Sequence, residues 1–402
     1  MTYPLVDLSD LAELNPVHGR NFPNPGLVSF LGMADVSESG STLSGEDRDY
    51  LEVSKGYTPF RNGDILVAKI TPCFQNGKIA QADLKRGVGA GSTEFHVVRP
   101  RANVDARYLL RFLRQDWIRT EGELRMTGSG GQRRVPQAYL ADLKVPAPPL
   151  VEQRRIGALL DHVDALRVKR RQSIDLLDDL VRSIFMEMFG DPGAGWVESL
   201  VEDLVIPGKD AIRTGPFGSQ LLREEFTEEG VAVLGIDNAV QNEFAWAGRR
   251  FISHEKYRQL RRYTVKPGDV LITIMGTCGR CAVVPDDIPM AINTKHLCCI
   301  SLDKSKCLPE FLHSYFLLHP DSRQYLARVA KGAIMAGLNM GLIKKLPVQL
   351  PPLALQQEYV SRKQRVQQMR ADHERHLATL DELFTSLQQR AFAGELWEHE
   401  AA

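Results

Sequence analysis

The chain has 402 residues, of which 43% are apolar and 25% are charged, and its 50 basic residues balance its 50 acidic residues. This is the composition of a globular protein, and the length predicts at least two domains. A net charge of zero argues against a general polyanion binder, because such binding rests on an excess of Lys and Arg. It leaves open a sequence-specific reader of nucleic acid with local basic faces.

The N-terminal sequence MTYPLVDLSDLAEL has no basic segment followed by an apolar run, so we predict no signal peptide. No apolar run approaches the length of about 20 residues that a membrane span needs. One cysteine lies in the first half of the chain and five lie in the second, which is not the pattern of a disulfide framework. We therefore expect a reducing, cytoplasmic location and no membrane partner.

Residues 1–147 are predicted to form an α+β domain. The segments 64–70, 78–84 and 94–100 have the composition of short strands with turn residues between them. Residues 107–124 show helical spacing, with Leu109, Leu110, Leu113 and Trp117 on one side. The loop 127–137 that follows is rich in glycine, which lets a backbone approach a ligand closely.

A long helix is predicted over 148–190, after prolines that break regular structure and before the sequence GDPGAG. Residues 191–348 then repeat the first domain loosely, and a second long helix is predicted over 349–394. The two helical stretches align without a gap at an offset of 203 residues: the segment PPLVEQ at 148–153 matches PPLALQ at 351–356. An internal repeat of this kind means that the fold is built twice.

The order domain, helix, domain, helix predicts two antiparallel, coiled-coil-like helices and a pseudo-twofold molecule. The C-terminal tail, residues 395–402, is expected to pack near the N-terminus, because Trp397 falls about where Trp196 opens the second domain. The chain would then be circularly organised, like a permuted dimer.

The sequence resembles the specificity subunit of a type I restriction–modification system over nearly its full length. The motifs that carry the resemblance are the two PPL-x-x-Q segments, GPFGSQL at 215–221, ITPCFQNGK at 70–78 and GSTEFHVVRP at 91–100. The resemblance implies an α+β fold in which two β-rich target-recognition domains each read one half of a bipartite, asymmetric double-stranded DNA sequence. Two long helices would set the half-site spacing and dock two methyltransferase subunits.

The resemblance also implies a motor-nuclease subunit as a further partner. It implies no cofactor in this chain, with S-adenosylmethionine, ATP and Mg²⁺ on the partner subunits. The residues themselves show no P-loop and no Asn-Pro-Pro-aromatic methyltransferase motif, so no catalytic residue is predicted. Asp64 with Asp83 and Lys85 is the nearest nuclease-like pattern, and we interpret it as solvated charges at strand ends. A stand-alone DNA-modifying enzyme and a protein-interaction scaffold remain the alternatives.

For DNA contact we favour loop residues with amides, hydroxyls and cations, because these groups bond base edges and phosphates. In the first domain they are Lys69, Thr71, Gln75, Asn76, Lys78, Ser92, Thr93, Gln132, Arg133 and Arg134. In the second domain they are Arg213, Ser219, Arg249, Arg250, Asn293, Thr294, Lys295, His296 and Lys331.

The heptad positions of the long helices are predicted to dock the methyltransferase subunits. They are Ile156, Val163, Leu177, Ile184, Val366, Leu380 and Leu387. The seams are interrupted at their centres by Arg167, Arg170, Arg370 and His373. This basic layer could fix the register of the helices or face a partner or the DNA spacer, and we favour the interpretation that it reaches out to water where the helices splay apart.

The cysteines Cys278, Cys281, Cys298 and Cys299 could in principle bind zinc. The adjacent pair is awkward for one tetrahedral ion, and buried free cysteines are common, so we predict no metal site.

Overall fold

The computed structural model describes residues 3–17, 24–331 and 338–396. The chain divides into two compact units. Unit 1 consists of residues 1–171 with 375–402, and unit 2 consists of residues 172–374. Unit 1 is thus made from both ends of the chain, which is the circular organisation that the repeat predicts.

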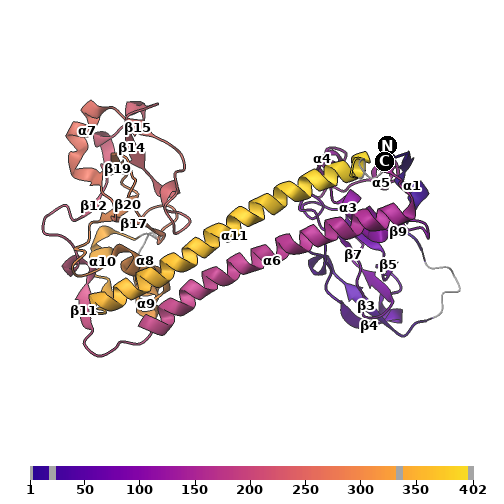
Figure 1. Ribbon diagram of the computed structural model, residues 1–402, viewed down its shortest axis with the longest axis horizontal. Coiled ribbons are helices and arrows are strands. Elements are labelled where there is room, and N and C mark those ends of the chain that lie inside the picture. Colours follow the sequence, from indigo (N-terminus) through magenta and orange to yellow (C-terminus); the bar gives the residue numbers. More distant parts are fainter. Residues whose placement is uncertain (1–2, 18–23, 332–337, 397–402) are drawn as a thin grey trace, which may run out of the picture. The chain divides into compact units, whose positions relative to one another are not determined.

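Unit 1 contains two four-stranded sheets and a two-stranded pairing (Figure 1). The first sheet has the order β2 (Ala12–Leu14), β9 (Phe95–Pro100), β6 (Ile65–Ala68), β7 (Ile79–Gln81) and is antiparallel throughout. The second has the order β4 (Glu46–Asp49), β3 (Leu27–Leu31), β8 (Val88–Gly91), β5 (Thr58–Arg61), with β3 and β8 parallel. Strand β1 (Leu5–Asp7) pairs with β10 (Lys144–Pro146). The predicted strands at 64–70, 78–84 and 94–100 are confirmed as β6, β7 and β9.

Unit 2 repeats this topology, with one additional strand, β13 (Phe226–Thr227), at the edge of its second sheet. Its first sheet has the order β12 (Ile212–Thr214), β20 (Leu297–Ile300), β17 (Val270–Thr273), β18 (Cys281–Val283). Its second has the order β13 (Phe226–Thr227), β15 (Phe251–Ile252), β14 (Val231–Leu234), β19 (Ala291–Asn293), β16 (Thr264–Val265), with β14 and β19 parallel. Strand β11 (Val197–Leu200) pairs with β21 (Pro347–Leu350). The sheets therefore match more closely than the sequences of the two domains do.

The shorter helices lie against these sheets. In unit 1 they are α1 (Leu8–Leu11), α2 (Tyr50–Val53), α3 (Ala106–Leu113), α4 (Asp116–Leu124) and α5 (Gln137–Ala141). In unit 2 they are α7 (His254–Leu260), α8 (Pro309–Leu318), α9 (Pro320–Lys331) and α10 (Met340–Lys344).

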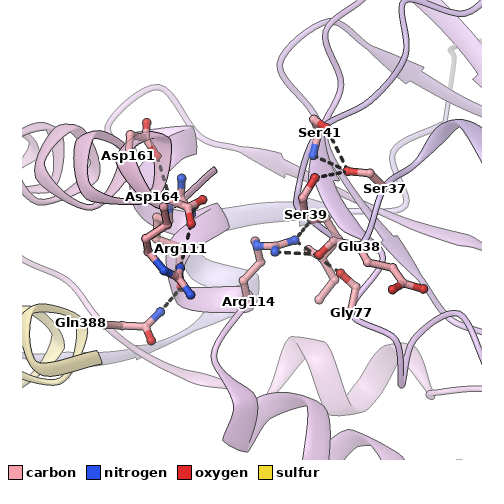
Figure 2. Close-up of polar contacts among 12 residues, drawn as sticks. Ser37, Glu38, Ser39, Ser41, Gly77, Arg111, Arg114, Asp161, Asp164 and Gln388 are labelled. Carbon is pink, nitrogen blue, oxygen red and sulfur yellow. Dashed lines mark hydrogen bonds and ion pairs between the residues drawn. The ribbon is translucent and has the colours of Figure 1, made fainter. Parts of the chain in front are cut away.

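The single helix predicted over 107–124 is wrong in one respect, because the chain breaks between α3 and α4. At the break, Arg114 donates to the carbonyl oxygens of Ile79 at 2.8 Å and Glu38 at 2.9 Å (Figure 2). Gln115 has extended backbone angles and begins α4. The new helix direction leaves Trp117 43% exposed, so it does not share the buried face of Leu109 and Leu113.

Each long helix begins at its PPL-x-x-Q segment. Helix α6 spans Leu150–Phe189 and α11 spans Leu353–Ala393, which confirms both predicted helices. The two prolines before each helix restrain the chain away from helical angles. After α11, Gly394 takes a φ of 78°, the left-handed conformation that commonly ends a helix at glycine.

The ends of the long helices complete the core of each unit. In unit 1, the Phe392 ring of α11 lies 5.3 Å from Tyr108 and 5.4 Å from Phe112. In unit 2, Phe189 of α6, the repeat equivalent of Phe392, lies 5.0 Å from Phe311. Helices α6 and α11 run antiparallel, because Arg167 contacts Asp381 whereas Asp178, further along α6, contacts Arg370, which comes earlier in α11. No described helix is both long and apolar enough to cross a membrane.

Candidate nucleic-acid interface

Three loops meet at one end of the first sheet of unit 1, where β6 ends and β9 begins. The Thr71 hydroxyl, in the loop after β6, donates to the Gly131 carbonyl at 2.7 Å and accepts from the Arg133 N–H at 3.1 Å. The Thr71 N–H donates to the Arg133 carbonyl at 2.9 Å. The loop before β9 joins them through Glu94, whose carboxylate is held by Arg134 at 2.8 and 3.0 Å. The structure thus brings the three predicted loops of domain one together.

Several predicted DNA-contact side chains are already bonded within unit 1. The Arg134 guanidinium lowers the pKa of the Glu94 carboxyl by its hydrogen bonds, so this pair stays ionised. The Gln75 amide donates to Glu123 at 2.6 Å. These groups position the loops, and a base would have to displace their partners.

Other predicted residues are free to face a ligand. Asn76, Thr93 and Gln132 are exposed and Lys69 is half-buried, whereas the half-buried Ser92 hydroxyl already accepts from the Glu94 N–H at 3.1 Å. The Arg133 side chain is 43% exposed, and its ion pair with Glu123 is long, at 3.8 Å. Arg133 is therefore the cation in these loops that is best placed for a phosphate or a guanine edge.

Lys78 has a structural partner. Its ammonium group donates to the Met33 carbonyl at 3.0 Å, which joins the loop after β6 to the segment after β3. A carbonyl partner leaves the positive charge uncompensated, so Lys78 still adds to the positive potential at this end of the sheet.

Unit 2 has an equivalent loop at the corresponding end of its own first sheet. Thr294, Lys295 and His296 separate β19 from β20, as Ser92 and Thr93 separate β8 from β9. A neighbouring segment approaches this loop closely, with the Gly215 N–H donating to the Thr294 carbonyl at 3.3 Å. A Cβ atom at position 215 would lie 2.0 Å from the Asn293 carbonyl oxygen, so only glycine fits there. This explains the first glycine of the GPFGSQL motif.

Polar atoms without partners gather at this end of the sheet in unit 2. Asn293 Oδ1, Thr294 Oγ1 and Arg250 Nε are buried and have no hydrogen-bond partner among the residues that the structure describes. Burial, followed by the charges of Lys295 and Arg250, lowers the pKa of His296. Buried polar groups without partners are uncommon, and they are frequent where a protein receives a ligand.

A hollow of about 230 Å³ lies beside this loop and was missed by the sequence reasoning. It is lined by Trp246, Arg249 and Arg250 together with apolar residues of β14. Trp246 is 43% exposed, and Arg250 is ion-paired with Asp237. The signal in the sequence was the aromatic residue three positions before two arginines in AWAGRR, since aromatic and basic side chains together suit a nucleobase.

The structure places Arg213, a predicted DNA-contact residue, in the interior of unit 2. Its side chain is 6% exposed and donates to Asp269 at 2.8 Å and to the Ser301 hydroxyl at 2.9 Å. In unit 1, the equivalent buried carboxylate, Asp64, is held by Arg99 at 2.7 Å. The arginine comes from a different strand in each unit, and in both it neutralises a buried aspartate.

The ion pair between Arg99 and Asp64 corrects the interpretation of Asp64 as a solvated charge. Asp64 is 3% exposed and accepts two hydrogen bonds from Arg99. A carboxylate that is buried and ion-paired in this way has a structural role in the sheet.

Two remaining predicted contact residues are placed differently. Ser219 is exposed on a short turn, Gly218–Gln220. Lys331 ends α9, and its side chain lies outside the described part of the chain, as does the loop 332–337.

The predicted methyltransferase-docking residues are mostly buried within the chain itself. Ile156 (0% exposed), Val163 (4%), Leu177 (8%) and Val366 (6%) are core residues, while Ile184, Leu380 and Leu387 are half-buried. The heptad pattern identified a face that packs inside each unit, so the four buried side chains are not available to a partner, and docking through the three half-buried ones stays a prediction. The exposed apolar residues of the long helices are Val151, Leu166, Leu176, Leu180, Met186, Met369 and Leu383.

The basic layer of the helices is ion-paired, which contradicts the interpretation that it only reaches out to water. In unit 1, Arg167 of α6 bonds Asp381 of α11 at 2.5 Å and lies 4.4 Å above the Phe384 ring. In unit 2, Arg370 Nε of α11 lies 3.0 Å from the Asp178 carboxylate of α6, outside the angle of a hydrogen bond, so the contact is electrostatic. Arg170 and His373 are not without partners either.

The cysteines do not converge. Cys298 and Cys299 are neighbours on β20, so they point to opposite faces and lie in different apolar clusters. Burial raises the pKa of the Cys298 thiol to about 12, which keeps it protonated and a poor metal ligand. Among the described residues, no group of three or more His, Cys, Asp and Glu side chains could hold a metal.

Fold and loops together define a class of duplicated α+β proteins in which each half carries its own candidate nucleic-acid interface. The family described as "Type I restriction modification DNA specificity domain" matches residues 3–176 and 223–378. The chain therefore belongs to the family of type I restriction–modification specificity proteins.

Three specificity subunits of type I restriction enzymes from Escherichia coli are similar to this chain. The EcoAI subunit is 38% identical over 184 residues, which are 44% of this chain and 31% of that protein. The EcoEI subunit is 35% identical over 205 residues, 49% and 34% of the two chains. The EcoBI subunit is 24% identical over 300 residues, 67% and 62% of the two chains. The chain thus spans about a third of the length of the first two relatives.

Solved structures share the fold. A chain from work on complex assembly and conformational transition of the type I R-M system has a TM-score of 0.60 at 18% identity, over 98% of both chains. The S subunit of a type I system from M. genitalium has a TM-score of 0.58 at 15% identity, over 98% of this chain and 96% of that one. At such identities the likeness concerns the fold alone.

Proposed function

We propose that this chain is the DNA sequence-specificity subunit of a type I restriction–modification complex. Each unit reads one half of a bipartite, asymmetric DNA target, and the chain itself is non-catalytic. The observation that carries this proposal is the repeated loop: Ser92 and Thr93 in unit 1, and Thr294 and Lys295 in unit 2, lie in the equivalent loop that joins the second sheet to the first. The side chains around the two loops differ, so the two half-sites differ.

In unit 1, Arg133 and Gln132 reach the base edges, and Thr71 and Arg134 hold their loop in shape. In unit 2, Lys295 and Arg249 supply positive charge, and the hollow beside Trp246 receives an apolar group such as a thymine methyl. Hydroxyls and backbone amides nearby bind phosphates, which fix the register of the protein on the duplex.

Partner subunits supply the chemistry. Two methyltransferase subunits bring S-adenosylmethionine, and a motor-nuclease subunit brings ATP and Mg²⁺. The long helices dock the methyltransferases through exposed apolar residues such as Leu176 and Leu180, which are 67% and 42% exposed. Because α6 and α11 each pass from one unit into the other, their length sets the half-site separation, which must suit a duplex that repeats about every 10 bp.

Reconstitution of this chain with its methyltransferase subunits tests the proposal. Methylome sequencing of a host that carries the complex is expected to return one bipartite motif with two unlike halves and a fixed spacer. Methyl transfer or cleavage by the isolated chain would instead establish a stand-alone enzyme. A complex that assembles but shows no preferred DNA sequence would establish a scaffold.

A further inference from the structure

Unit 2 contains a cavity that the proposed function does not use. It is open to solvent on one side and has a volume of about 880 Å³ between α6, α8 and α11 and the loops at 241–244 and 283–286. Its wall is mixed, with apolar Leu177, Val284, Leu317 and Val366 beside charged groups. The loops that we assign to DNA do not line it.

A buried lysine lines this cavity. Lys363 of α11 is 7% exposed, and its ammonium group donates to Ser314 Oγ at 3.1 Å and to His313 Nδ1 at 3.3 Å. His313 Nε2 lies 2.8 Å from the Asn242 carbonyl, so Nε2 carries the proton and Nδ1 is the acceptor. An ammonium group has three donors, and these contacts use two of them.

The charge of Lys363 has no close counter-charge. Among the described residues, no carboxylate lies within the 4.0 Å that defines an ion pair with Lys363. The nearby acidic groups Asp178 and Glu243 face Arg370, at 3.0 and 3.6 Å. Burial lowers the pKa of Lys363, and the carboxylates of Glu310 and Glu243, both beyond ion-pair distance, compensate for it only in part. Burying an ammonium group without an anion is costly.

The internal repeat shows that this arrangement is specific to unit 2. At the offset of 203 residues, Lys363 corresponds to Leu160 and His313 to Leu110, which are 0% and 8% exposed core residues of unit 1. The same packing site is therefore apolar in one unit and cationic in the other. A fold that accepts two leucines here does not need a lysine for its stability.

In unit 1, by contrast, the cation between the corresponding helices, Arg111, is neutralised by two carboxylates. Arg111 of α3 reaches Asp161 at 2.8 Å and Asp164 at 2.7 Å on α6 (Figure 2). The equivalents of the two aspartates in unit 2 are Gln364 and Gln367. Unit 2 has thus kept a cation between these helices and lacks both of the carboxylates that would neutralise it.

We propose that the cavity of unit 2 binds a small organic anion whose carboxylate or phosphate group meets the third donor of Lys363. The body of the ligand lies against Leu177, Leu317 and Val366. A volume of about 880 Å³ is ample for a compact metabolite, since ligand pockets range from about 300 to 1,000 Å³. The inference is independent of DNA recognition.

Two probes that share an apolar body separate the head-group chemistries: benzoate and phenyl phosphate, with benzyl alcohol as the neutral analogue. The full chain is titrated by calorimetry at constant ionic strength set with chloride. Thermal unfolding is followed in parallel. We expect at least one of the anions to bind and to raise the Tm by about 5 °C at a hundred times its dissociation constant, while benzyl alcohol has no effect.

Lys363→Leu copies the residue of unit 1 and is expected to fold and to bind the anion at least tenfold more weakly. Lys345→Leu, at the end of α10 and outside the cavity lining, is the matched control and keeps full affinity. A measurement on the unaltered chain makes the test independent of variant folding: the bound anion should slow acetylation of Lys363 by acetic anhydride, read by mass spectrometry. No binding of either anion, or equal binding by Lys363→Leu, overturns the proposal.

Discussion

Gln153 and Gln356 make the same clamp at the start of the two long helices. Each amide nitrogen donates at 2.9 Å to the carbonyl of the first proline of its motif, Pro148 or Pro351. Each amide oxygen accepts from the backbone just before the shorter helix, from Asp105 N–H at 2.9 Å and Leu308 N–H at 2.8 Å. The PPL-x-x-Q motif is therefore a structural device that fastens each helix to its domain.

Replacing Gln153 by Leu should destabilise unit 1 because it leaves a buried carbonyl and a buried N–H without partners. The expected loss is about 2–6 kcal/mol in the free energy of unfolding, at about 1–3 kcal/mol for each of the two groups. Urea unfolding measures it. Gln172→Ala, on the exposed face of α6, is the control and should change stability by less than about 0.5 kcal/mol. Equal stability of the two variants would contradict a clamp.

Arg133 and Arg134 are neighbours with different expected roles in DNA binding. Arg133→Ala should weaken binding of the domain-one half-site by the methyltransferase complex by about 1–3 kcal/mol, because the side chain is exposed and weakly paired. If Arg133 meets a phosphate rather than a base, the loss will be uniform over sequences and the salt dependence of binding will fall by about one charge. A mobility-shift assay over a salt series separates the two cases.

Arg101→Ala is the matched control, since Arg101 follows β9 at the end opposite the recognition loops. It should leave binding unchanged. Arg134→Ala should act through the loop, because it releases Glu94, and the double variant Arg134→Ala with Glu94→Ala should recover part of the loss. Full affinity in Arg133→Ala would remove this loop from the interface.

Arg213→Met should unfold unit 2 rather than alter base preference. The change leaves the Asp269 carboxylate buried at 3% exposure without its cation, which costs about 3–5 kcal/mol. Arg249→Met, at an exposed position, should keep the stability and lose DNA affinity. Calorimetric unfolding and a binding assay on the same two variants check the contrast. A stable Arg213→Met protein with changed specificity would restore Arg213 to the interface.

The repeat, the long helices and the main strands could be predicted because they depend on local patterns: period-two strands, proline at the helix starts and a fixed offset. Which loop residues are free could not be predicted. Arg133, Arg134 and Arg213 look alike in sequence, and only tertiary contacts with Glu123, Glu94 and Asp269 distinguish them.

The heptad pattern could not show which residues of the long helices face a partner, for a related reason. Apolar spacing such as that of Ile156 and Val163 identifies a face that is removed from water, and it does not say which surface covers that face. Here the domains and the other helix cover it. The break at Arg114 was also hidden, because the carbonyl groups that bind this arginine belong to segments distant in the sequence.

The ion pair of Arg167 with Asp381 should stabilise the helix pairing of unit 1 modestly. A double-mutant cycle with Arg167→Met and Asp381→Asn is expected to give a coupling energy of about 1 kcal/mol or less, since Asp381 is 41% exposed. The coupling should shrink in 1 M salt. A coupling energy of zero at low salt would return the layer to a solvated role.

His313 should make unit 2 less stable in mild acid. Burial lowers the pKa of His313 from 6.5 to about 4, so between these values the unfolded chain binds a proton that the folded chain does not. Stability from this group is therefore complete above pH 6.5 and falls by about 1.4 kcal/mol per pH unit as the pH drops toward 4.

Other buried histidines act in the same direction, so the informative quantity is the difference in slope between the unaltered protein and a variant without His313. His313→Leu, which copies Leu110 of unit 1, should flatten the slope of the unfolding free energy between pH 6.5 and 5 by one proton, whatever its effect at pH 7. Urea unfolding at three pH values measures both slopes, and parallel slopes would show that His313 titrates normally.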